Sequence, residues 1–456
     1  MELGFIIEAT NGKLVSDGSA AELSGVSTDT RNINGGEVFF ALRGENFDGH
    51  EFVEEAFEKG ARAAVLERVP QNIREGATVI QVQSTLRALG DLAHAWRNTF
   101  KNLKLAAITG SNGKTTTKEM AWSIVSLKHE TLKNTGNFNN LIGLPLTLFE
   151  LRGSNDAAVV ELGMNDFGEI SRLSQIARPD IGAITNIGRA HLEKLGGLDG
   201  VAKAKGELVE GFGEDRVFVV NADDPRVQKI ADGTPCRKIT YGTQSETAFI
   251  SASCIDEKDL SGITFNMSIG NEMFPVRLGC IGVHNVMNAL CAAGIAYSFG
   301  CSTDEIKEGL ERFKPERMRL EVVDTPYGFS VINDAYNANP DSVRRAIDEL
   351  VRLKGDGRTV AVLGDMLELG DASEEEHRAI GEYLSASGVD YVITYGRFGS
   401  SVLDSVSNGT SGVHAATHVE AADALSRFAG IGDLVLVKGS RGMRMEEVIK
   451  NLDEGA

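Results

Sequence analysis

The chain has 456 residues and carries 46 Lys or Arg against 65 Asp or Glu, so its formal charge is −19 at pH 7. This acidic balance argues against nucleic acid or an anionic membrane as the main partner, although a local site can still be positive and bind a small anion. The composition, with 42% hydrophobic and 24% charged residues, is typical of globular proteins, and at roughly 150 residues per domain the length predicts about three domains.

The first block, residues 1–84, predicts a small α/β domain. Its short apolar runs are typical of buried strands, and an amphipathic segment at 52–59 lies between two of them. The strand-like runs are residues 38–42, 63–66 and 78–82.

The second block, residues 85–315, alternates apolar strands with helices. A helical segment at 85–99 leads into a strand at 104–109, which is followed by a glycine loop and a helix. Because strands that alternate with helices form βαβ units, this block predicts a mostly parallel sheet. Further expected elements are strands at 157–162, 181–187 and 216–220, a β-rich stretch at 237–280 and a helix at 285–299.

The third block, residues 316–456, repeats this alternation, with strands expected at 329–332, 359–363, 391–394 and 434–437. Helical patterns between the strands predict a second doubly wound domain. The predicted fold class is therefore α/β in three domains: a small N-terminal α/β domain, a central parallel sheet of the phosphate-loop ATPase kind, and a C-terminal Rossmann-like domain.

The cysteines and the apolar runs indicate in which cellular compartment the protein is expected. The five cysteines form no C-x-x-C pair, and their odd number favours free thiols in a reducing cytosol over a disulfide framework. The N-terminal residues lack a basic region and a long apolar stretch, so no signal peptide is expected. No run of about 18 apolar residues exists, so no membrane span is expected, and the expected location is the cytoplasm. The chain is also expected to be a monomer.

A strand, a glycine loop and a helix follow one another around residue 110, which favours phosphate binding. Glycines let backbone N–H groups approach phosphate oxygens, and the helix N-terminus adds positive potential. Lys114 is expected to contact the β- and γ-phosphates, and the Thr115 hydroxyl to bind Mg²⁺. The spacing is shorter than in the common phosphate loop, and the alternative is a glycine-rich turn with an incidental Lys-Thr pair. The loop residues are Gly110, Ser111, Asn112, Gly113, Lys114, Thr115 and Thr116.

Three further side chains are functional candidates at or near the rim where the expected strands end. Glu161 ends an apolar strand and is either a Mg²⁺ ligand or a solvated strand end. His191 follows the next strand and is either catalytic or structural. Lys205 lies on a helical segment, where a surface charge is the plain alternative.

Polar residues in the second and third blocks leave similar choices open. Asp334 ends a strand, and Asn337 and Asn339 follow in a turn for which an Asn-Pro pair is well suited, so they either contact ligands or make the turn. His284, Asn285 and Asn288 open a helix, where Asn285 could simply be the N-cap. Lys438 and Arg441 follow a strand and either bind a carboxylate or phosphate or are solvated loop charges.

Taken together, these residues resemble the Mur ligase family, which adds amino acids or a dipeptide to the peptidoglycan precursor. The family's short nucleotide loop resembles 109–116, its strand-end glutamate resembles Glu161, and its histidine with a following lysine resembles His191 and Lys205. The resemblance spans all three blocks, and it is strongest for the D-alanyl-D-alanine-adding branch. The stretches that carry this are 134–140, 333–340, 363–370 and 437–441.

The resemblance implies roles for these residues. Lys205 would be carbamylated and would help to hold a second Mg²⁺ near His191, since an unmodified ammonium repels a metal ion. Lys114, His191 and Lys205 would be catalytic, and ATP would contact the loop together with His284, Asn285, Asn288, Arg319 and Asp334. The family usually has Gly-Arg where this chain has Met318-Arg319, so Arg317 rivals Arg319. Substrate contacts would come from Ser27, Asp29, Arg31, Asp48, His50, Asn137, Asn139, Asn140, Asn337 and Asn339.

The implied reaction is ATP-dependent amide formation between UDP-N-acetylmuramoyl-tripeptide and D-alanyl-D-alanine through an acyl phosphate. Residues 1–84 would hold the UDP sugar, 85–315 the ATP, and 316–456 the dipeptide, closing over ATP. The tripeptide would end in L-lysine or diaminopimelate. The alternatives are a sibling ligase, such as folylpolyglutamate synthetase or the third-residue-adding Mur ligase, and a non-catalytic ATP-sensing protein.

Overall fold

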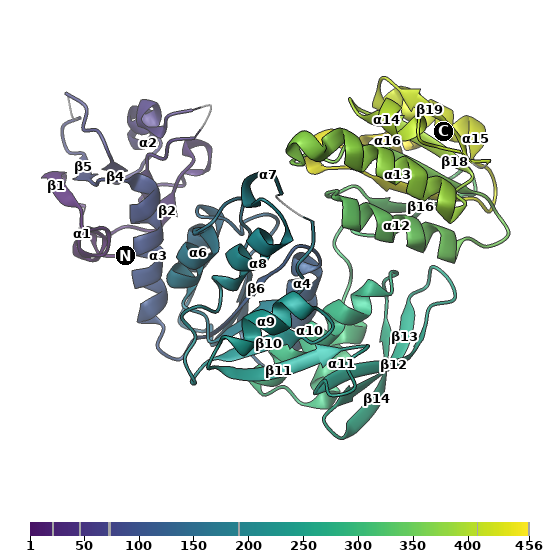
Figure 1. Ribbon diagram of the computed structural model, residues 1–456. Coiled ribbons are helices and arrows are strands. Elements are labelled where there is room, and N and C mark those ends of the chain that lie inside the picture. Colours follow the sequence, from purple (N-terminus) through teal and green to yellow (C-terminus); the bar gives the residue numbers. More distant parts are fainter. Residues whose placement is uncertain (21, 45–46, 72–73, 190–191, 408, 455–456) are drawn as a thin grey trace. The chain divides into compact units, whose positions relative to one another are not determined.

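The computed structural model describes residues 1–20, 22–44, 47–71, 74–189, 192–407 and 409–454. Its strands form three sheets, and Figure 1 labels the helices and strands for which there is room. The chain forms two compact units: the first comprises residues 1–107, 129–164 and 168–180, and the second comprises 108–128, 165–167 and 181–456. Among the described residues, none of the helices combines the length and the apolar character that a bilayer crossing requires.

The N-terminal sheet has the strand order β1-β5-β4-β3-β2, and its pairs are parallel except for β1 with β5. Helices α1 (Leu3–Thr10) and α3 (Thr85–Thr99) pack on one face, and α2 (Val53–Glu58) packs on the other. β3 and β4 are buried at every residue, as strands covered on both faces must be. The strands are β1 (Lys13–Ser16), β2 (Val26–Ser27), β3 (Val38–Phe40), β4 (Ala63–Leu66) and β5 (Thr78–Gln81).

The central sheet has nine strands in the order β14-β13-β12-β11-β10-β9-β6-β8-β7. β9 to β12 pair in parallel, whereas β12, β13 and β14 are antiparallel. The strands are β6 (Lys104–Thr109), β7 (Thr131–Lys133), β8 (Ala157–Glu161), β9 (Ile181–Ile184), β10 (Val217–Asn221), β11 (Arg237–Gly242), β12 (Ile250–Asp256), β13 (Ile263–Ile269) and β14 (Glu272–Leu278). The helices are α4 (Lys114–Val125), α5 (Gly143–Phe149), α6 (Glu169–Ala177), α7 (Leu192–Leu195), α8 (Leu198–Gly206), α9 (Pro225–Asp232), α10 (His284–Phe299) and α11 (Thr303–Arg312).

The C-terminal sheet has the order β15-β16-β20-β17-β18-β19, parallel except for β15 with β16. Helices α12 (Pro340–Leu353), α13 (Ser373–Ser387) and α14 (Gly399–Leu403) cover one face, and α15 (His418–Phe428) and α16 (Glu446–Glu454) cover the other. This is the doubly wound arrangement expected from the sequence. The strands are β15 (Glu321–Asp324), β16 (Ser330–Asp334), β17 (Thr359–Gly364), β18 (Tyr391–Tyr395), β19 (Ser411–Ala415) and β20 (Leu434–Lys438).

The elements with long apolar runs were predicted well, and short or exposed ones were missed. The helix at 85–99 and the strand at 104–109 agree with α3 and β6, and the other expected strands agree within a few residues. β19 was missed because four of its five residues are exposed, and β15 because it is only half buried. Expected strand 181–187 ends at Ile184, since Thr185 to Gly188 turn away to bind a loop instead.

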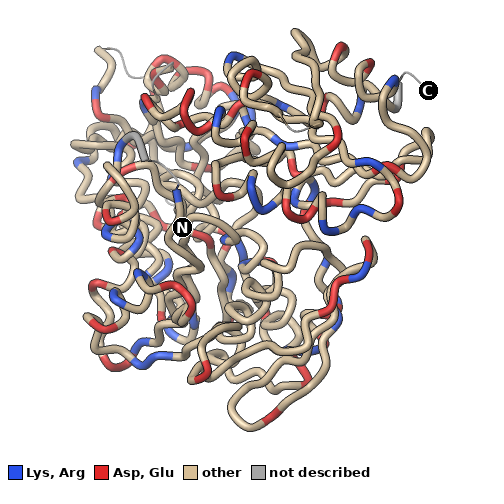
Figure 2. The backbone as a smooth tube through the Cα atoms, turned by 45° about the vertical axis from the view of Figure 1, so that its right-hand side comes forward, with Lys and Arg blue, Asp and Glu red and all other residues tan. Residues whose placement is uncertain are grey.

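Acidic and basic residues are interspersed along the described backbone, as Figure 2 shows. The negative total charge is therefore spread over many elements. A site for a small anion has to draw on local cations such as Lys114 and Arg319, which both lie in the second unit.

Candidate functional site

The glycine loop joins the end of β6 to α4, and its shape depends on two glycines. Gly110 has φ +149, and a Cβ atom there would lie 1.9 Å from Thr185 Oγ1. Gly113 has φ +79 and is the N-cap of α4, and a Cβ atom there would lie 2.2 Å from Asn288 Oδ1. Because both positions combine a backbone suited to glycine with a close polar neighbour, a side chain at either would deform the loop.

The middle of the loop is held by the segment that follows β9. The Ser111 amide donates to the Asn186 carbonyl at 3.0 Å, and the Ser111 hydroxyl donates to the Gly188 carbonyl at 3.0 Å. Asn186 binds Asn112 twice, since its Oδ1 accepts from the Asn112 amide and its Nδ2 donates to the Asn112 carbonyl, both at 3.0 Å. Thr185 Oγ1 donates to the same carbonyl at 2.6 Å. The sequence prediction missed Asn186, although its place at the end of an apolar strand was a usable signal.

Lys114 and Thr115 begin α4 and carry the chemistry expected of the loop. Lys114 Nζ donates to the Gly110 carbonyl at 2.9 Å and to the Ser111 carbonyl at 3.4 Å, so the ammonium lies over the loop. Thr115 Oγ1 accepts a hydrogen bond of 2.8 Å from Arg319 Nη2. The loop thus brings together an ammonium, a hydroxyl and a guanidinium.

Arg319 lies in a stretch with unusual backbone geometry. Met318 and Leu320 on either side of it have φ +62 and φ +51, in the left-handed region that favours glycine. The Arg319 guanidinium carbon lies 4.0 Å from the centre of the Tyr336 ring. Arg317 is exposed, so the geometry favours Arg319 as the arginine of the loop site.

The start of α10 lies against the loop. Asn288 Nδ2 donates to Asn285 Oδ1 at 2.8 Å, and Asn285 Nδ2 donates to the Ile281 carbonyl at 2.7 Å. The N-cap of this helix is Val283, so capping does not explain Asn285. Burial, followed by the charges of Arg345, Lys438 and Arg352, lowers the pKa of His284 well below its ordinary value, although a third of its side chain is exposed.

The carboxyl ends of β16 and β20 meet at a buried ion pair. Lys438 Nζ binds the Asp334 carboxylate and donates to the Asn337 carbonyl at 2.9 Å. Asp334 Oδ1 also accepts from the Leu320 amide at 3.2 Å, which ties this pair to the Arg319 stretch. Asn337 Oδ1 accepts from the Ala338 amide at 2.9 Å, in keeping with turn chemistry.

Asn339 has two partners. Its Oδ1 accepts from the Ser342 amide at 2.9 Å and makes it the N-cap of α12, while its Nδ2 donates to Asn112 Oδ1 at 3.0 Å. The same part of the second unit holds Arg189, whose amide donates to Asp341 Oδ2 at 2.8 Å and whose guanidinium pairs with Glu376 at 2.7 Å. The loop and the segment after β9 therefore both contact the α12 region.

In the first unit, Glu161 ends β8 with 3% of its surface exposed. Asn139 Nδ2 donates to Glu161 Oε1 at 2.8 Å. Asn140 Oδ1 instead accepts from the Ile142 and Gly143 amides at 3.1 and 2.9 Å, and Asn137 is exposed. The three asparagines expected to contact substrate thus have three different environments.

The expected UDP-binding residues form two separate turns. Asp29 accepts from the Arg31 amide and pairs with the Arg31 guanidinium at 2.6 Å, and Ser27 Oγ donates to the Asp29 carbonyl at 3.0 Å. Asp48 accepts from His50 Nδ1 at 2.6 Å, and His50 Nε2 accepts from the Glu67 amide at 2.9 Å. These contacts lower the pKa of both aspartates, Asp29 mainly through its side-chain bond to Arg31 and Asp48 mainly through the His50 amide.

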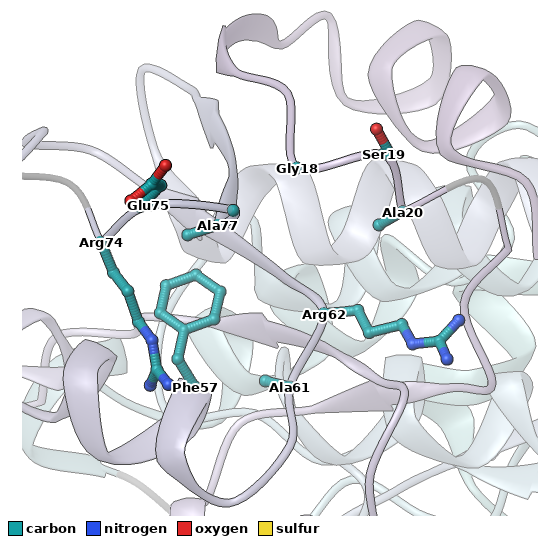
Figure 3. Close-up of a pocket in the computed structure, with 10 residues that line it drawn as sticks. Gly18, Ser19, Ala20, Phe57, Ala61, Arg62, Arg74, Glu75 and Ala77 are labelled. Atoms are coloured by element: carbon teal, nitrogen blue, oxygen red, sulfur yellow. The ribbon is translucent and has the colours of Figure 1, made fainter.

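A cavity of about 490 Å³ lies elsewhere in the N-terminal part and contains none of these expected residues. It is lined by the backbone at Gly18 and Gly76 and by side chains that precede β4 and β5, including Arg62. Figure 3 shows Arg74 extending beside Phe57 while Arg62 points away. His50 instead bonds to Glu67, which follows β4, so the expected UDP turn and this cavity lie at opposite ends of that strand.

The metal-site candidates are described only in part. Lys205 on α8 is 2% exposed, so the surface-charge alternative is wrong for it, while Lys203 lies 5.7 Å from the Phe167 ring centre. His191 lies outside the described residues. Within the described part of the chain, no group of three or more His, Cys, Asp or Glu side chains is arranged to hold a metal ion, and the five cysteines are free thiols.

Comparison with known proteins covers nearly the whole chain. Residues 22–97 match the Mur ligase family catalytic domain, 108–296 the Mur ligase middle domain, and 318–441 the Mur ligase glutamate ligase domain. A curated relative, UDP-N-acetylmuramoyl-tripeptide--D-alanyl-D-alanine ligase of Bacillus subtilis, is 40% identical over 95% of this chain and 93% of its own length. The crystal structure of MurF from Acinetobacter baumannii has a TM-score of 0.90 at 33% identity, covering 99% of this chain and 98% of that one. MurF ligase from Thermotoga maritima in complex with ADP has a TM-score of 0.85 at 28% identity, covering 95% of this chain and 98% of that one.

Proposed function

The chain belongs to the Mur ligase family, and we propose that it joins D-alanyl-D-alanine to UDP-N-acetylmuramoyl-tripeptide, converting ATP to ADP and phosphate. The observation that carries this proposal is the conformation of the loop at 110–116. The segment after β9 holds this loop through hydrogen bonds, and Arg319 contacts it at Thr115. ATP use is supported by the ADP complex of a relative that this chain covers almost completely.

In this proposal, the ATP phosphates lie on the loop and the start of α4. The amides of Ser111 and Asn112 bind Asn186, and the N-terminus of α4, which begins after Gly113, would bind phosphate oxygens. Lys114 would turn its ammonium from the loop carbonyls to the phosphates, and Arg319 would neutralise charge beside Thr115. Asn288 lies against Gly113 and is bonded to Asn285, and His284 and Asp334 complete the expected ATP set.

The hydroxyl of Thr115 and the carboxylate of Glu161 are hard oxygen donors of the kind that Mg²⁺ prefers, and we assign them to the metal. His191 and carbamylated Lys205 would hold a second ion. A lysine that is 2% exposed fits this role, because carbamylation replaces the ammonium with an anionic group whose oxygens can bind a metal ion. Bound Mg²⁺ would neutralise charge on the transferring phosphoryl group.

Lys205 offers a direct test of the carbamate. We expect Lys205→Ala to be inactive and to regain part of its activity with added short carboxylates, because these can replace the missing carbamate oxygens. Lys203→Ala, two residues away on α8 and exposed, is the matched control and should neither lose comparable activity nor respond to carboxylates. Full activity of Lys205→Ala without any carboxylate would remove Lys205 from the metal site.

The reaction then runs in two steps. The tripeptide's terminal carboxylate attacks the γ-phosphorus, which breaks the bond to ADP and forms an acyl phosphate. The amine of D-alanyl-D-alanine attacks the acyl carbon, phosphate leaves with the C–O bond electrons, and the nitrogen loses a proton to give the amide. Exclusion of water protects the acyl phosphate in between, and contacts of the loop with the α12 region are suited to this.

We place the UDP sugar on residues 1–84, ATP on 85–315 and the dipeptide on 316–456. Ser27, Asp29, Arg31, Asp48 and His50 would contact the UDP end, and Asn137, Asn140, Asn337 and Asn339 the rest of the substrates. The turns that hold Asp29 and Asp48 are prefolded by their own hydrogen bonds, which suits rigid recognition of a sugar nucleotide.

The deciding experiment is phosphate release from ATP with UDP-N-acetylmuramoyl-tripeptide, with and without D-alanyl-D-alanine. Tripeptides ending in L-lysine and in diaminopimelate are tested side by side, and an amine panel adds glutamate and single amino acids. Release that depends on D-alanyl-D-alanine supports the proposal. Release with another amine would favour a sibling ligase, and ATP binding with no acceptor-dependent release would favour a non-catalytic ATP sensor.

A further inference from the structure

The side chain of Asn139 binds a candidate metal ligand. Its Nδ2 donates to Glu161 Oε1 at 2.8 Å. Asn139 follows β7, and Glu161 is the last residue of β8, so the contact spans the carboxyl ends of two paired strands. Both side chains lie in the first unit, and the Glu161 carboxylate is almost completely buried.

The backbones of these two residues are fixed to each other independently of that contact. Asn134, 1% exposed, accepts from the Glu161 amide at 2.9 Å and donates to the Glu161 and Phe138 carbonyls, both at 3.0 Å. The Gly163 amide donates to the Asn139 carbonyl at 2.8 Å. With the main chains held in this way, the hydrogen bond from Asn139 helps to set the rotamer of the Glu161 carboxylate.

Gly163 makes room for the Asn139 amide. A Cβ atom at position 163 would lie 2.7 Å from Asn139 Oδ1 and 2.8 Å from its Cγ. Gly163 does not have a left-handed φ, so its backbone would accept alanine without strain. The requirement for glycine therefore comes from the side chain of Asn139 and not from the fold of the chain.

We propose that Asn139 is a positioning residue that aims the Glu161 carboxylate at Mg²⁺, rather than a substrate contact, and that Gly163 exists to admit it. This inference rests on the proposed role of Glu161 as a metal ligand. Hydrogen-bond partners of ligating side chains fix the orientation of the ligand, and their loss typically weakens metal binding by about 10–100-fold.

Mn²⁺ binding to the full chain with saturating ADP, followed by electron paramagnetic resonance, tests the proposal without relying on turnover. We expect Asn139→Ala to weaken Mn²⁺ binding by about tenfold or more. Asn139→Leu keeps most of the side-chain volume but lacks the N–H donor, so it should be equally weak. Asn139→Leu with wild-type Mn²⁺ affinity would show that packing alone matters and would overturn the inference.

Gly163→Ala supplies an independent perturbation of the same contact. It should weaken Mn²⁺ binding as Asn139→Ala does, and the double variant should be no weaker than either single one, because alanine at 139 leaves room for the new methyl group. Additive losses would contradict the steric pairing. Asn134→Ala is the structural comparator, and it should lower the melting temperature more than Asn139→Ala, because Asn134 holds main-chain groups.

Glu161→Gln separates the inference from the proposed function. If Glu161→Gln weakens Mn²⁺ binding but Asn139→Ala does not, the positioning role is wrong and the metal assignment stands. If Glu161→Gln leaves Mn²⁺ binding unchanged, the metal assignment fails and the positioning role fails with it. Acceptor-dependent phosphate release is measured on the same wild-type preparation and reports on the ligase proposal alone.

Discussion

At Arg319, a single contact distinguishes two neighbouring arginines that the sequence left as rivals. Arg319 donates to the Thr115 hydroxyl at 2.8 Å and lies over the Tyr336 ring, whereas Arg317 is exposed. Sequence could not decide between them because the reversal of chain direction here uses two left-handed residues, Met318 and Leu320, neither of which is a glycine. Which arginine points at the loop depends on those two φ angles.

We predict that Arg319→Ala lowers kcat/KM for ATP by about 10–100-fold, as expected for the loss of a hydrogen bond from a charged group worth about 1.5–3 kcal/mol. Arg317→Ala, two residues away, should stay within about twofold, since surface substitutions usually have little effect. Steady-state kinetics at varied ATP measure both. Equal losses in the two variants would contradict the assignment.

At the scale of elements, the sequence predicted those helices and strands that have a clear apolar pattern, together with their alternation along the chain. The strand β6 and the strands of the doubly wound C-terminal sheet were recognisable because they are continuous apolar runs. The helix α4 was recognisable because it follows β6 and the glycine loop. Most of the remaining site could not be read from local sequence. Asn288 and Arg319 were expected only through the family resemblance, because they reach the loop from distant positions in the chain and meet it through tertiary packing. Asn186 was missed although it lies where an apolar strand ends, because sequence does not show which groups the loop binds.

The loop glycine at 113 gives a prediction with a matched control. Gly113 and Gly300 have φ +79 and φ +84, but a Cβ atom at 113 would meet Asn288, whereas nothing lies within 4 Å of one at 300. Both alanine variants should lose roughly 1–2 kcal/mol of stability from backbone strain. Only Gly113→Ala should also weaken ADP binding, by about 100-fold for a displaced phosphate loop, as measured by calorimetry. Similar ADP affinities in the two variants would show that the clash with Asn288 does not matter.

His377 links the turn after β17 to α13 and makes stability depend on pH. Its Nε2 accepts from the Met366 amide at 2.9 Å, its Nδ1 donates to the Ser373 carbonyl at 2.6 Å, and burial lowers its pKa below the ordinary 6.5. In the unfolded chain, His377 takes up a proton near pH 6.5, whereas in the folded chain it does so only at a lower pH. The free energy of unfolding that His377 contributes is therefore fully present above pH 6.5 and is lost as the pH falls towards the pKa of the folded state. The slope is at most about 1.4 kcal/mol per pH unit for one group.

We therefore predict that His377→Gln is less stable than the wild type near pH 7 but loses less stability on going to about pH 5.5. Apparent urea midpoints of the full chain at both pH values measure this difference. An unchanged pH dependence in the variant would show that His377 does not titrate on unfolding in this range.

At the scale of the whole molecule, the nucleotide loop and the C-terminal sheet share contacts within the second unit. Asn339 donates to Asn112 in the loop, and Arg189 binds both Asp341 and Glu376. Each contact is polar and individually weak, so together they can form and break during a catalytic cycle. Ligand binding at the loop and the position of α12 are thereby linked.

Asn339 separates this link from helix capping. Asn339→Ala removes both the cap of α12 and the donor to Asn112, and should cost about 1 kcal/mol of stability. Asn339→Asp keeps the cap acceptor but lacks the donor, so it should have wild-type stability and a KM for ATP raised by roughly 2–10-fold, the range for one lost hydrogen bond. Thermal unfolding and kinetics distinguish the two effects. Wild-type kinetics in Asn339→Asp would show that the link to Asn112 has no role in turnover.

The two loop glycines also constrain how this protein can change over evolutionary time or in the hands of an engineer. The space that Gly110 and Gly113 leave open is occupied by Thr185 and Asn288, which come from other elements of the second unit. The seven-residue loop therefore does not keep its conformation on its own. In another α/β protein without residues equivalent to Thr185 and Asn288, it would lose the contacts that define its shape. Positions 110 with 185, and 113 with 288, should be inherited as pairs, and a redesign of nucleotide preference has to treat each pair as one unit.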